Sequence, residues 1–171
     1  MKLDVPYISQ FLDTSDPYWM PRACGMACLK MVLDFYGKKT PPLLEMCKKG
    51  EAEGGYSKHG WLHDYFLKVA REYGLEAERG EKIGEILGLQ RIHDELKAGH
   101  PVVVSVVKRI LGQAKFHMVA LTGYEENENG NIAGFYFNEP ESLYPELGKD
   151  IFVDVKTFLN DWRRMAIFIR E

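Results

Sequence analysis

The chain has 171 residues, with 22 lysines and arginines against 25 aspartates and glutamates, a formal net charge of −3 and a hydrophobic content of 46%. A chain of this length buries roughly 70% of the surface that it exposes when unfolded, enough for one core and too little for two large domains. Because the charges are nearly balanced, the sequence offers no basic stripe for a nucleic acid and no polybasic arm for a membrane. We expect a single domain, residues 1–171, with no nucleic-acid partner and no membrane insertion.

The cysteines and the apolar runs predict a compartment. No apolar run approaches the roughly 20 residues of a spanning helix, and Met1 to Pro6 contain no apolar signal-peptide core. Three cysteines are an odd number, which argues against a disulfide framework and leaves metal binding, reactivity or burial as explanations. We expect a cytoplasmic protein, whose oligomeric state the sequence does not predict.

The first half of the chain, up to Gly99, has helical periodicity. Apolar residues recur on one face of each segment, and Gly37 and Gly74 are placed to end two of the helices. The expected helices run from about Cys24 to Gly37, from Thr40 to near Gly50, from an N-cap at Ser57 to Gly74, and through Leu89, Ile92 and Leu96.

The second half predicts strands. Val102 to Val107 is a β-branched run broken only by Ser105, which favours a central strand covered on both faces. Phe116 to Tyr124 and Ile132 to Phe137 flank a polar turn that contains Asn-Gly, so we expect them to pair antiparallel. Two further short strands flank a helical turn that carries Phe158 and Trp162; they are Ile151 to Val155 and Ala166 to Ile169. The predicted class is α+β, with helices segregated from an antiparallel sheet.

Cys24 is the main candidate for a chemical role. It lies where a loop enters the first expected helix, so unpaired backbone N–H groups and the helix dipole favour its thiolate. Gly25 removes a side chain that would crowd a substrate, and Gln10, fourteen residues before Cys24, offers a side-chain amide for an oxyanion hole. The alternative interpretations are a small buried cysteine and a surface glutamine.

A nucleophilic thiol needs a base within hydrogen-bond reach, and His117 is the best candidate among five histidines. It shares a strand face with Val119 and Leu121, which places an ionisable ring at the start of an apolar strand. The alternative is a core histidine satisfied by a backbone partner. His93 and His100 are expected at a solvated helix end.

The expected hairpin suggests a partner for His117. A turn centred between Asn127 and Gly130 pairs residues whose numbers sum to about 257, which puts His117 opposite about residue 140. With a register error of one or two residues, the partner is Asn138 or Glu139, and either side chain can orient an imidazole. A Cys-His-(Asn or carboxylate) arrangement follows.

Four segments resemble, in order, those of the papain-like cysteine peptidases, and within them the double-glycine (bacteriocin) leader peptidase-like group related to the peptidase domains of peptide-exporting ABC transporters. They are Val5–Gln10, Ala23–Ala27 leading to Leu33 and Tyr36-Gly37, Pro101–Val104 followed by His117–Tyr124, and Asn138–Pro140. The resemblance covers most of the chain and implies a papain-like fold. In that fold a helical N-terminal half packs on an antiparallel C-terminal sheet, with the active site in the cleft between them. Gly54-Gly55 and Gly112 lie in polar segments that border this cleft or serve as linkers.

By this resemblance, Cys24 is the nucleophile, His117 the general base and acid, Gln10 the oxyanion-hole residue and Glu139 the third member of the triad. The family usually has aspartate before this proline, so Asn138 is the alternative partner of His117. The implied activity is that of a cysteine peptidase, a thiol hydrolase that cleaves a peptide or protein substrate through a thioester acyl-enzyme. No cofactor and no metal are implied.

Three alternatives remain open. Cys24 and Cys28, like His59 and His63, are four residues apart, which suits a zinc site, although neither typical zinc-finger spacing nor the glutamate of H-E-x-x-H is present. A second alternative is a weak or inactive pseudopeptidase that binds peptides, in which Glu139 in place of aspartate reflects the loss of catalysis. A non-proteolytic acyltransferase or amidase uses the same triad.

Overall fold

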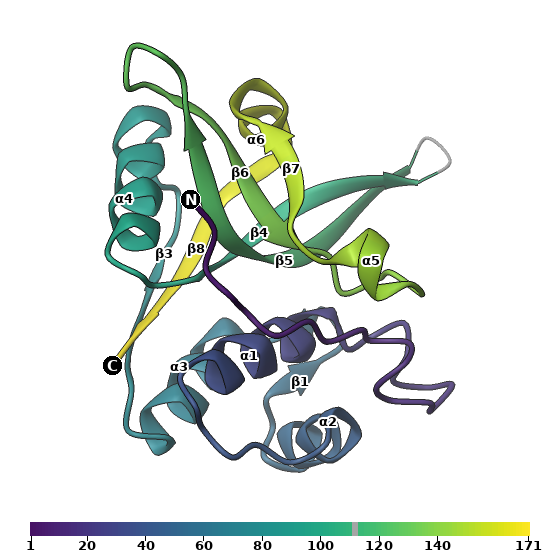
Figure 1. The fold of residues 1–171 in the computed structure, drawn as a ribbon. Coiled ribbons are helices and arrows are strands. Elements are labelled where there is room, and N and C mark those ends of the chain that lie inside the picture. Colours follow the sequence, from purple (N-terminus) through teal and green to yellow (C-terminus); the bar gives the residue numbers. More distant parts are fainter. Residues whose placement is uncertain (111–112) are drawn as a thin grey trace.

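The computed structural model describes residues 1–110 and 113–171, and Gly112, one of the expected cleft or linker residues, lies outside them. An antiparallel sheet stands above a group of helices from the N-terminal half (Figure 1). The helices are α1 (Cys24–Phe35), α2 (Leu43–Ala52), α3 (His63–Glu72), α4 (Glu85–Lys97), α5 (Pro145–Gly148) and α6 (Val155–Asp161). The strands are β1 (Tyr56–Ser57), β2 (Gly60–Trp61), β3 (Glu76–Gly80), β4 (Val102–Ile110), β5 (Gln113–Glu126), β6 (Ile132–Asn138), β7 (Ile151–Asp154) and β8 (Trp162–Arg170).

The large sheet has the order β3-β8-β4-β5-β6-β7, and β1 and β2 form a separate hairpin. Strand β4 lies inside this sheet between β8 and β5, as its β-branched run predicts. The side chains of Val102, Val103 and Val104 are all buried, which confirms that this strand is covered on both faces. The predicted α+β class is correct.

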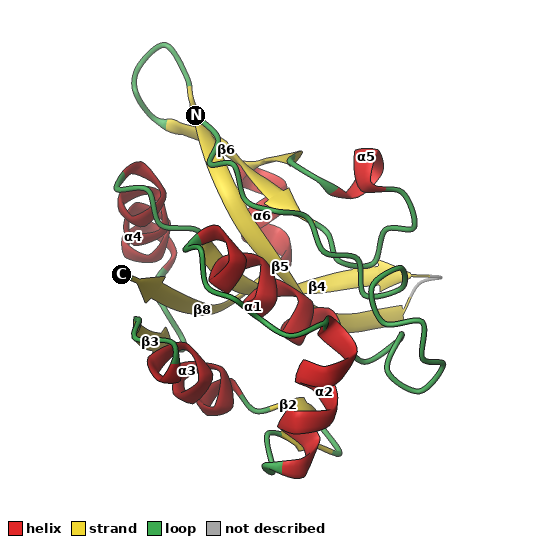
Figure 2. Ribbon diagram, turned by 60° about the horizontal axis from the view of Figure 1, so that its bottom comes forward, coloured by secondary structure: helices red, strands yellow, loops and turns green. Residues whose placement is uncertain are grey.

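Each face of the sheet has its own core. Figure 2 shows α1 crossing in front of the strands while α6 lies behind them. The core on the α1 side joins the first three helices to the sheet and includes Met26, Leu29, Phe66, Val103, Met118 and Ala120. The other core joins α4 and α6 to the sheet and includes Ile92, Leu96, Val104, Val119, Leu121, Phe135 and Phe158.

Two predicted helix starts are wrong. Ser57 is not an N-cap, because it pairs in the β1–β2 hairpin, where its hydroxyl donates to the Gly60 carbonyl and accepts from the His59 N–H. Helix α3 begins six residues later, at His63. Thr40 does not open α2, because its hydroxyl is bonded to Asp34 and Lys30 at the end of the preceding helix.

The remaining strands and helices agree with the sequence in kind and differ in extent. Strands β4, β5 and β8 are longer than expected, and Trp162 begins β8 instead of continuing the helical turn. Strand β3 and the short helix α5 were not predicted. In the β5–β6 hairpin, Ala120 pairs with Asn138, one residue from the expected register, and bulges interrupt the pairing.

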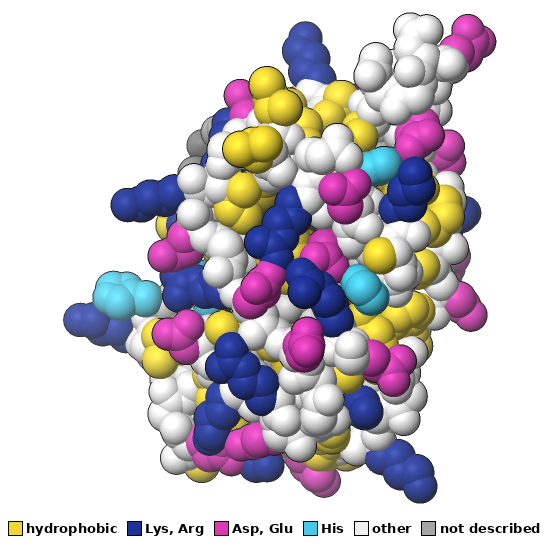
Figure 3. All heavy atoms as spheres, turned by 90° about the vertical axis from the view of Figure 1, so that its left-hand side faces the viewer, with side chains coloured by type: hydrophobic (Ala, Val, Ile, Leu, Met, Phe, Trp, Pro, Cys, Tyr) yellow, Lys and Arg dark blue, Asp and Glu magenta, His cyan; other side chains and the backbone are white. Residues whose placement is uncertain are grey.

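The surface charges are mixed, and the described helices are short. On the face that Figure 3 shows, basic and acidic side chains alternate without a patch of one sign. In the described part of the chain, no helix combines the length and the apolar character needed to span a bilayer.

Candidate active site

Helix α1 presents Cys24 at its N-terminus. Cys24 is the first helical residue, and Ala23 before it supplies no side-chain cap. The first turn contains no acidic residue, so its free N–H groups and the positive end of the dipole act on the thiol. Cys24 is partly exposed, whereas Cys28 and Cys47 are buried.

Gly25 serves packing and not substrate access, contrary to the expectation from the sequence. A Cβ at this position would lie 2.8 Å from the Phe66 ring and 3.0 Å from the Met118 sulfur. The glycine therefore lets α1 approach α3 and β5 closely. Because Met118 follows His117 in the chain, this close approach brings Cys24 towards the histidine.

His117 lies on β5 with its side chain 1% exposed. Its Nε2 is 2.5 Å from Glu139 Oε1, and within residues 1–110 and 113–171 its Nδ1 has no partner of ordinary hydrogen-bond geometry. Burial disfavours the imidazolium, but the Cys24 thiol and Glu139 outweigh that effect and raise the pKa of His117 to about 9. Nδ1 is the nitrogen left for the thiol, and such contacts are often loose before substrate binds.

Glu139, and not Asn138, contacts His117. Burial alone would raise the pKa of Glu139, but the hydrogen bond and the charge of His117 lower it, so the carboxylate form is favoured. The Asn138 side chain is completely buried and points elsewhere: its amide nitrogen is 3.4 Å from the Val5 carbonyl, and its oxygen accepts from the Asp150 N–H. The structure thus brings together Cys24, His117 and Glu139.

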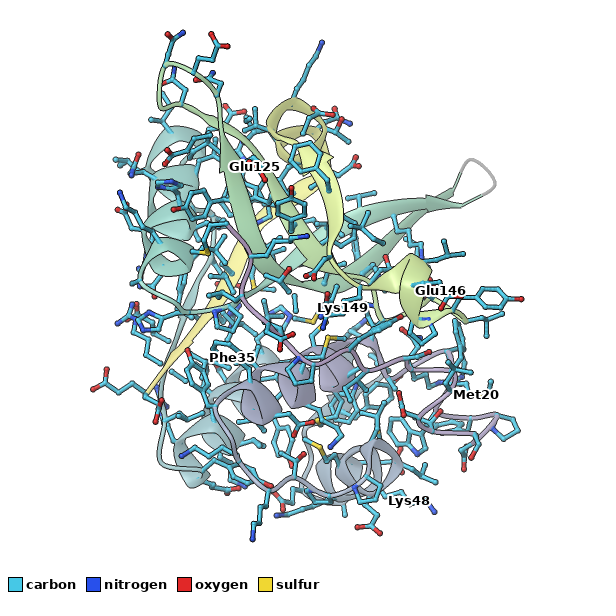
Figure 4. The ribbon with its side chains drawn as sticks, viewed as in Figure 1. Met20, Phe35, Lys48, Glu125, Glu146 and Lys149 are labelled. Atoms are coloured by element: carbon cyan, nitrogen blue, oxygen red, sulfur yellow. The ribbon has the colours of Figure 1, made fainter. Side chains whose placement is uncertain are left out.

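Gln10 is buried beside the same segment. Its backbone N–H donates to the Pro140 carbonyl, directly after Glu139. Its side-chain nitrogen donates to the Met20 carbonyl at 2.7 Å, whereas its side-chain oxygen is buried with no partner in the described part of the chain. Figure 4 labels Met20, in the loop that precedes α1, and Glu146, on α5, on the same side of the molecule.

The other cysteines and histidines do not join this group. The Cys28 thiol donates to the Met118 carbonyl, and burial raises its pKa well above the ordinary value. Across the described residues, no three histidines, cysteines or acidic residues gather as metal ligands would. The expectation of a solvated His93 is wrong, because its ring is buried against Tyr124 and lies 2.8 Å from Glu126.

An apolar cavity adjoins the His117–Glu139 pair. It has a volume of about 290 Å³ and lies among β4, β5, β6, β7 and α6. Besides His117 and Glu139, its walls include Val106, Val119, Leu121, Phe137, Val153 and Phe158. The cavity lies on the α6 side of the sheet, and of the described residues none from α1 lines it. Two further charged side chains, Lys108 and Asp161, belong to its lining.

Sequence reasoning missed one charged group near His117. The Glu141 carboxylate lies 3.8 Å from His117 Nδ1 and is bonded to Lys108 and Lys115. The one signal in the sequence was local, since Glu141 stands two residues after Glu139. The lysines come from β4 and β5, and only the pairing of these strands brings them to the site.

Comparisons with known structures show that the fold is shared with peptidase domains. A double-glycine motif protease from an AMS/PCAT transporter, solved in complex with the leader peptide, has 23% identity and a TM-score of 0.64, with 99% of this chain and 93% of that chain covered. The peptidase domain of Streptococcus ComA, a bifunctional ABC transporter, has 21% identity and a TM-score of 0.63, with coverages of 99% and 97%. A C39-like peptidase from Bacillus anthracis has 16% identity and a TM-score of 0.68, with coverages of 100% and 98%.

These likenesses establish the papain-like α+β fold, with its helical N-terminal half on an antiparallel sheet. No curated protein matches the sequence. The model of the Peptidase_C39 like family matches residues 2–167, which is nearly the whole chain. The chain therefore belongs to the Peptidase_C39 like family.

Proposed function

We propose that the chain is a cysteine peptidase in which Cys24 is the nucleophile, His117 the general base and acid, and Glu139 the residue that orients His117. One observation carries this proposal. A partly exposed thiol at a helix N-terminus lies beside a buried imidazole whose other nitrogen is held by a carboxylate. This arrangement has the parts that an activated thiol requires: a nucleophile, a base and a group that orients the base.

The reaction is acyl transfer. Cys24 gives its proton to His117 Nδ1, and the thiolate attacks the carbonyl carbon of a peptide bond. His117 then donates the proton to the leaving amine, and the thioester that remains on Cys24 is hydrolysed by water. Glu139 stays ionised throughout, fixes the tautomer and orientation of the ring, and stabilises the imidazolium.

Gln10 and the backbone N–H of Cys24 are the proposed oxyanion donors. A primary amide has two N–H groups, and the bond to Met20 uses one of them. The bond to Met20 fixes the amide plane, which leaves the second N–H for the developing oxyanion. Asn138 has no role in this chemistry, because its bonds to Val5 and Asp150 hold it in the core.

The proposed substrate is a peptide or protein. One structural neighbour was solved with a leader peptide, which supports a peptide substrate. We further propose that residues 1–171 form one domain, because the large sheet joins strands from both halves of the chain. The three free thiols suit a reducing compartment such as the cytoplasm.

The proposal is tested by the alkylation rate of each cysteine with iodoacetamide between pH 4 and 9, followed by mass spectrometry. We expect Cys24 alone to react fast at about pH 5 to 6, well below the roughly 8.5 at which a free thiol titrates. The His117→Ala variant should lose this reactivity while Cys28 and Cys47 stay unreactive. A Cys24 that reacts no faster than the other two thiols would contradict the catalytic assignment.

The same protein sample distinguishes peptidase activity from peptide binding and from acyl transfer. Incubation with a peptide library, with mass spectrometry of the protein and of the products, detects the acyl-enzyme and the cleavage. Fast alkylation of Cys24 without any cleaved peptide would reject the peptidase activity in favour of a peptide-binding or acyl-transferring protein. The Cys24→Ala variant is the control for cleavage by contaminants.

A further inference from the structure

Glu141 is the most constrained carboxylate near His117 outside the proposed triad. It lies three positions after the last residue of β6, and its side chain is 8% exposed. Burial alone would raise the pKa of Glu141, but hydrogen bonds from Lys108 and Lys115 lower it to about 2. A carboxylate that stays charged while it is buried needs such partners. Removing these charged groups from water costs free energy, which suggests that the arrangement serves the site.

Two lysines from neighbouring strands hold the Glu141 carboxylate. Lys108 of β4 lies 2.7 Å from Oε2, and Lys115 of β5 lies 2.6 Å from Oε1. Lys108 is also 3.7 Å from Glu139 Oε2, so one ammonium group stands between two carboxylates. The lysines thereby tie the start of the β6–α5 connection to the β4–β5 hairpin.

Glu141 also contacts Glu139 and His117 directly. Its backbone N–H donates to Glu139 Oε1 at 2.9 Å, and this is the oxygen that binds His117 Nε2. Its own carboxylate lies 3.8 Å from His117 Nδ1. One residue therefore fixes the orienting carboxylate on one side of the ring and adds a negative charge on the other.

From these contacts we infer that Glu141 is a positioning residue of the site: with Lys108 and Lys115 it holds Glu139 on His117 and stabilises the imidazolium form of His117. The inference rests on the proposed function, since the positioning matters only if His117 is the base. Glutamate has three rotatable side-chain bonds, so Glu139 needs more than its contact with His117 to stay in place. Without the Glu141 carboxylate, Lys108 would be free to pair with Glu139 and compete with His117 for it.

The groups that surround His117 set the sign of each expected effect. The ionisable side chains near this part of the site include Cys24 and Cys28 of α1, Tyr7 of the N-terminal segment, Lys108 of β4, Lys115 of β5, and Glu139 and Glu141 after β6. Asp161 of α6 lines the cavity beside His117. Removing a negative charge from this set should lower the pKa of His117, and removing a positive charge should raise it. A merely structural role for Glu141 predicts no such pair of opposite shifts.

The test is a pH titration by NMR of the full chain with ¹³C-labelled histidine, in which the His117 resonance is assigned with His117→Gln. We expect Glu141→Gln to lower the pKa of His117 by about half a unit to one unit. Lys115→Gln should raise it by a few tenths, because Lys115 is half exposed and acts through Glu141. Glu141→Asp keeps the charge and should restore at least half of the shift that Glu141→Gln causes.

Glu146→Gln is the matched control, since it removes a carboxylate five residues further along the chain, at an exposed position on α5 (Figure 4). The inference is overturned if Glu141→Gln shifts His117 no more than Glu146→Gln does. If Glu141→Gln does not fold, Lys115→Gln carries the test, and a shift of zero or of the opposite sign overturns the inference. Failure of the proposed function would be seen in a different experiment: Cys24 would then be alkylated at the same rate in the wild-type protein and in His117→Ala.

Discussion

On the helical side of the site, Cys24 takes its position from the start of α1 and the close packing of that helix, whereas on the sheet side His117 depends on Glu139, 22 residues away in the chain. The thiol is positioned by a helix N-terminus and by a glycine that lets the helix pack closely. The imidazole needs a partly buried carboxylate, and a second carboxylate with two lysines holds that carboxylate in place. One side is thus built from local structure and the other from long-range electrostatics, so substitutions should act on packing in the first and on ionisation in the second.

The largest effect on the helical side is expected for Gly25→Val. The new side chain would meet the Phe66 ring and the Met118 sulfur, and overpacking of this kind should lower the free energy of unfolding by roughly 3 kcal/mol. The displaced helix should also slow the alkylation of Cys24 at pH 5 to 6. Urea denaturation and mass spectrometry measure the two effects.

A glycine at the other end of α1 provides the control for this comparison. Gly37 has a φ of +73° and open space around its Cα, so Gly37→Ala should cost only about 1 kcal/mol through backbone strain. It should leave the reactivity of Cys24 unchanged. Equal losses of Cys24 reactivity in Gly25→Val and Gly37→Ala would show that general destabilisation, and not the α1 contact, explains the result.

On the sheet side, Glu139→Gln should lower the pKa of His117 from about 9 by one to two units, because the charged partner of Nε2 is lost. Asn138→Ala should leave that pKa unchanged while destabilising the fold, since it removes the acceptor of the Asp150 N–H. NMR titration of His117 compares the two variants. A larger shift of the His117 pKa in Asn138→Ala than in Glu139→Gln would contradict the prediction, because it would show that Asn138 orients His117.

The sequence predicted the helical side more fully than the sheet side, for physical reasons. The stripe of α1 and its stop at Gly37 are local signals, and they placed Cys24 correctly at the helix start. The β5–β6 register was one residue off, because bulges such as that between Leu121 and Gly123 do not show in a turn count. Ser57 was misread because a strand of two residues leaves no periodicity to detect.

The ion pairs of the site were the least predictable part. Glu141 stands 33 residues from Lys108 and 26 from Lys115, so no window of sequence relates them. Its neighbour Glu139 was reached by the hairpin arithmetic, within a register error of one or two residues, and by the family resemblance. The choice between Asn138 and Glu139 required the structure, because a register error of one residue exchanges the two positions.

A moderate effect is expected for the contribution of Glu141 to stability at acid pH. The pKa of Glu141 is lowered from 4.5 to about 2 in the folded state, so its contribution to stability is complete above about pH 4.5 and is lost as the pH falls towards 2. Wild-type protein should therefore lose on the order of 1–2 kcal/mol more than Glu141→Gln between pH 5.5 and 3. Urea denaturation at both pH values measures this difference. Parallel losses in the two proteins would mean that Glu141 is not stabilised by Lys108 and Lys115 in solution.

The smallest effect is expected at the two buried thiols, where burial has a larger influence on ionisation than any neighbouring charge. Burial raises the pKa of Cys47 to about 12 and that of Cys28 well above its ordinary value, so neither thiol should be alkylated at pH 8 until the protein unfolds. Cys28→Ala should cost about 1 kcal/mol, because it removes one small buried group, and it should leave the Cys24 alkylation profile unchanged. Cys28 lies one helical turn below Cys24. A marked change in the Cys24 profile would mean that Cys28 influences the ionisation of Cys24. The reactivity of Cys24 would then depend on more than the residues of the sheet.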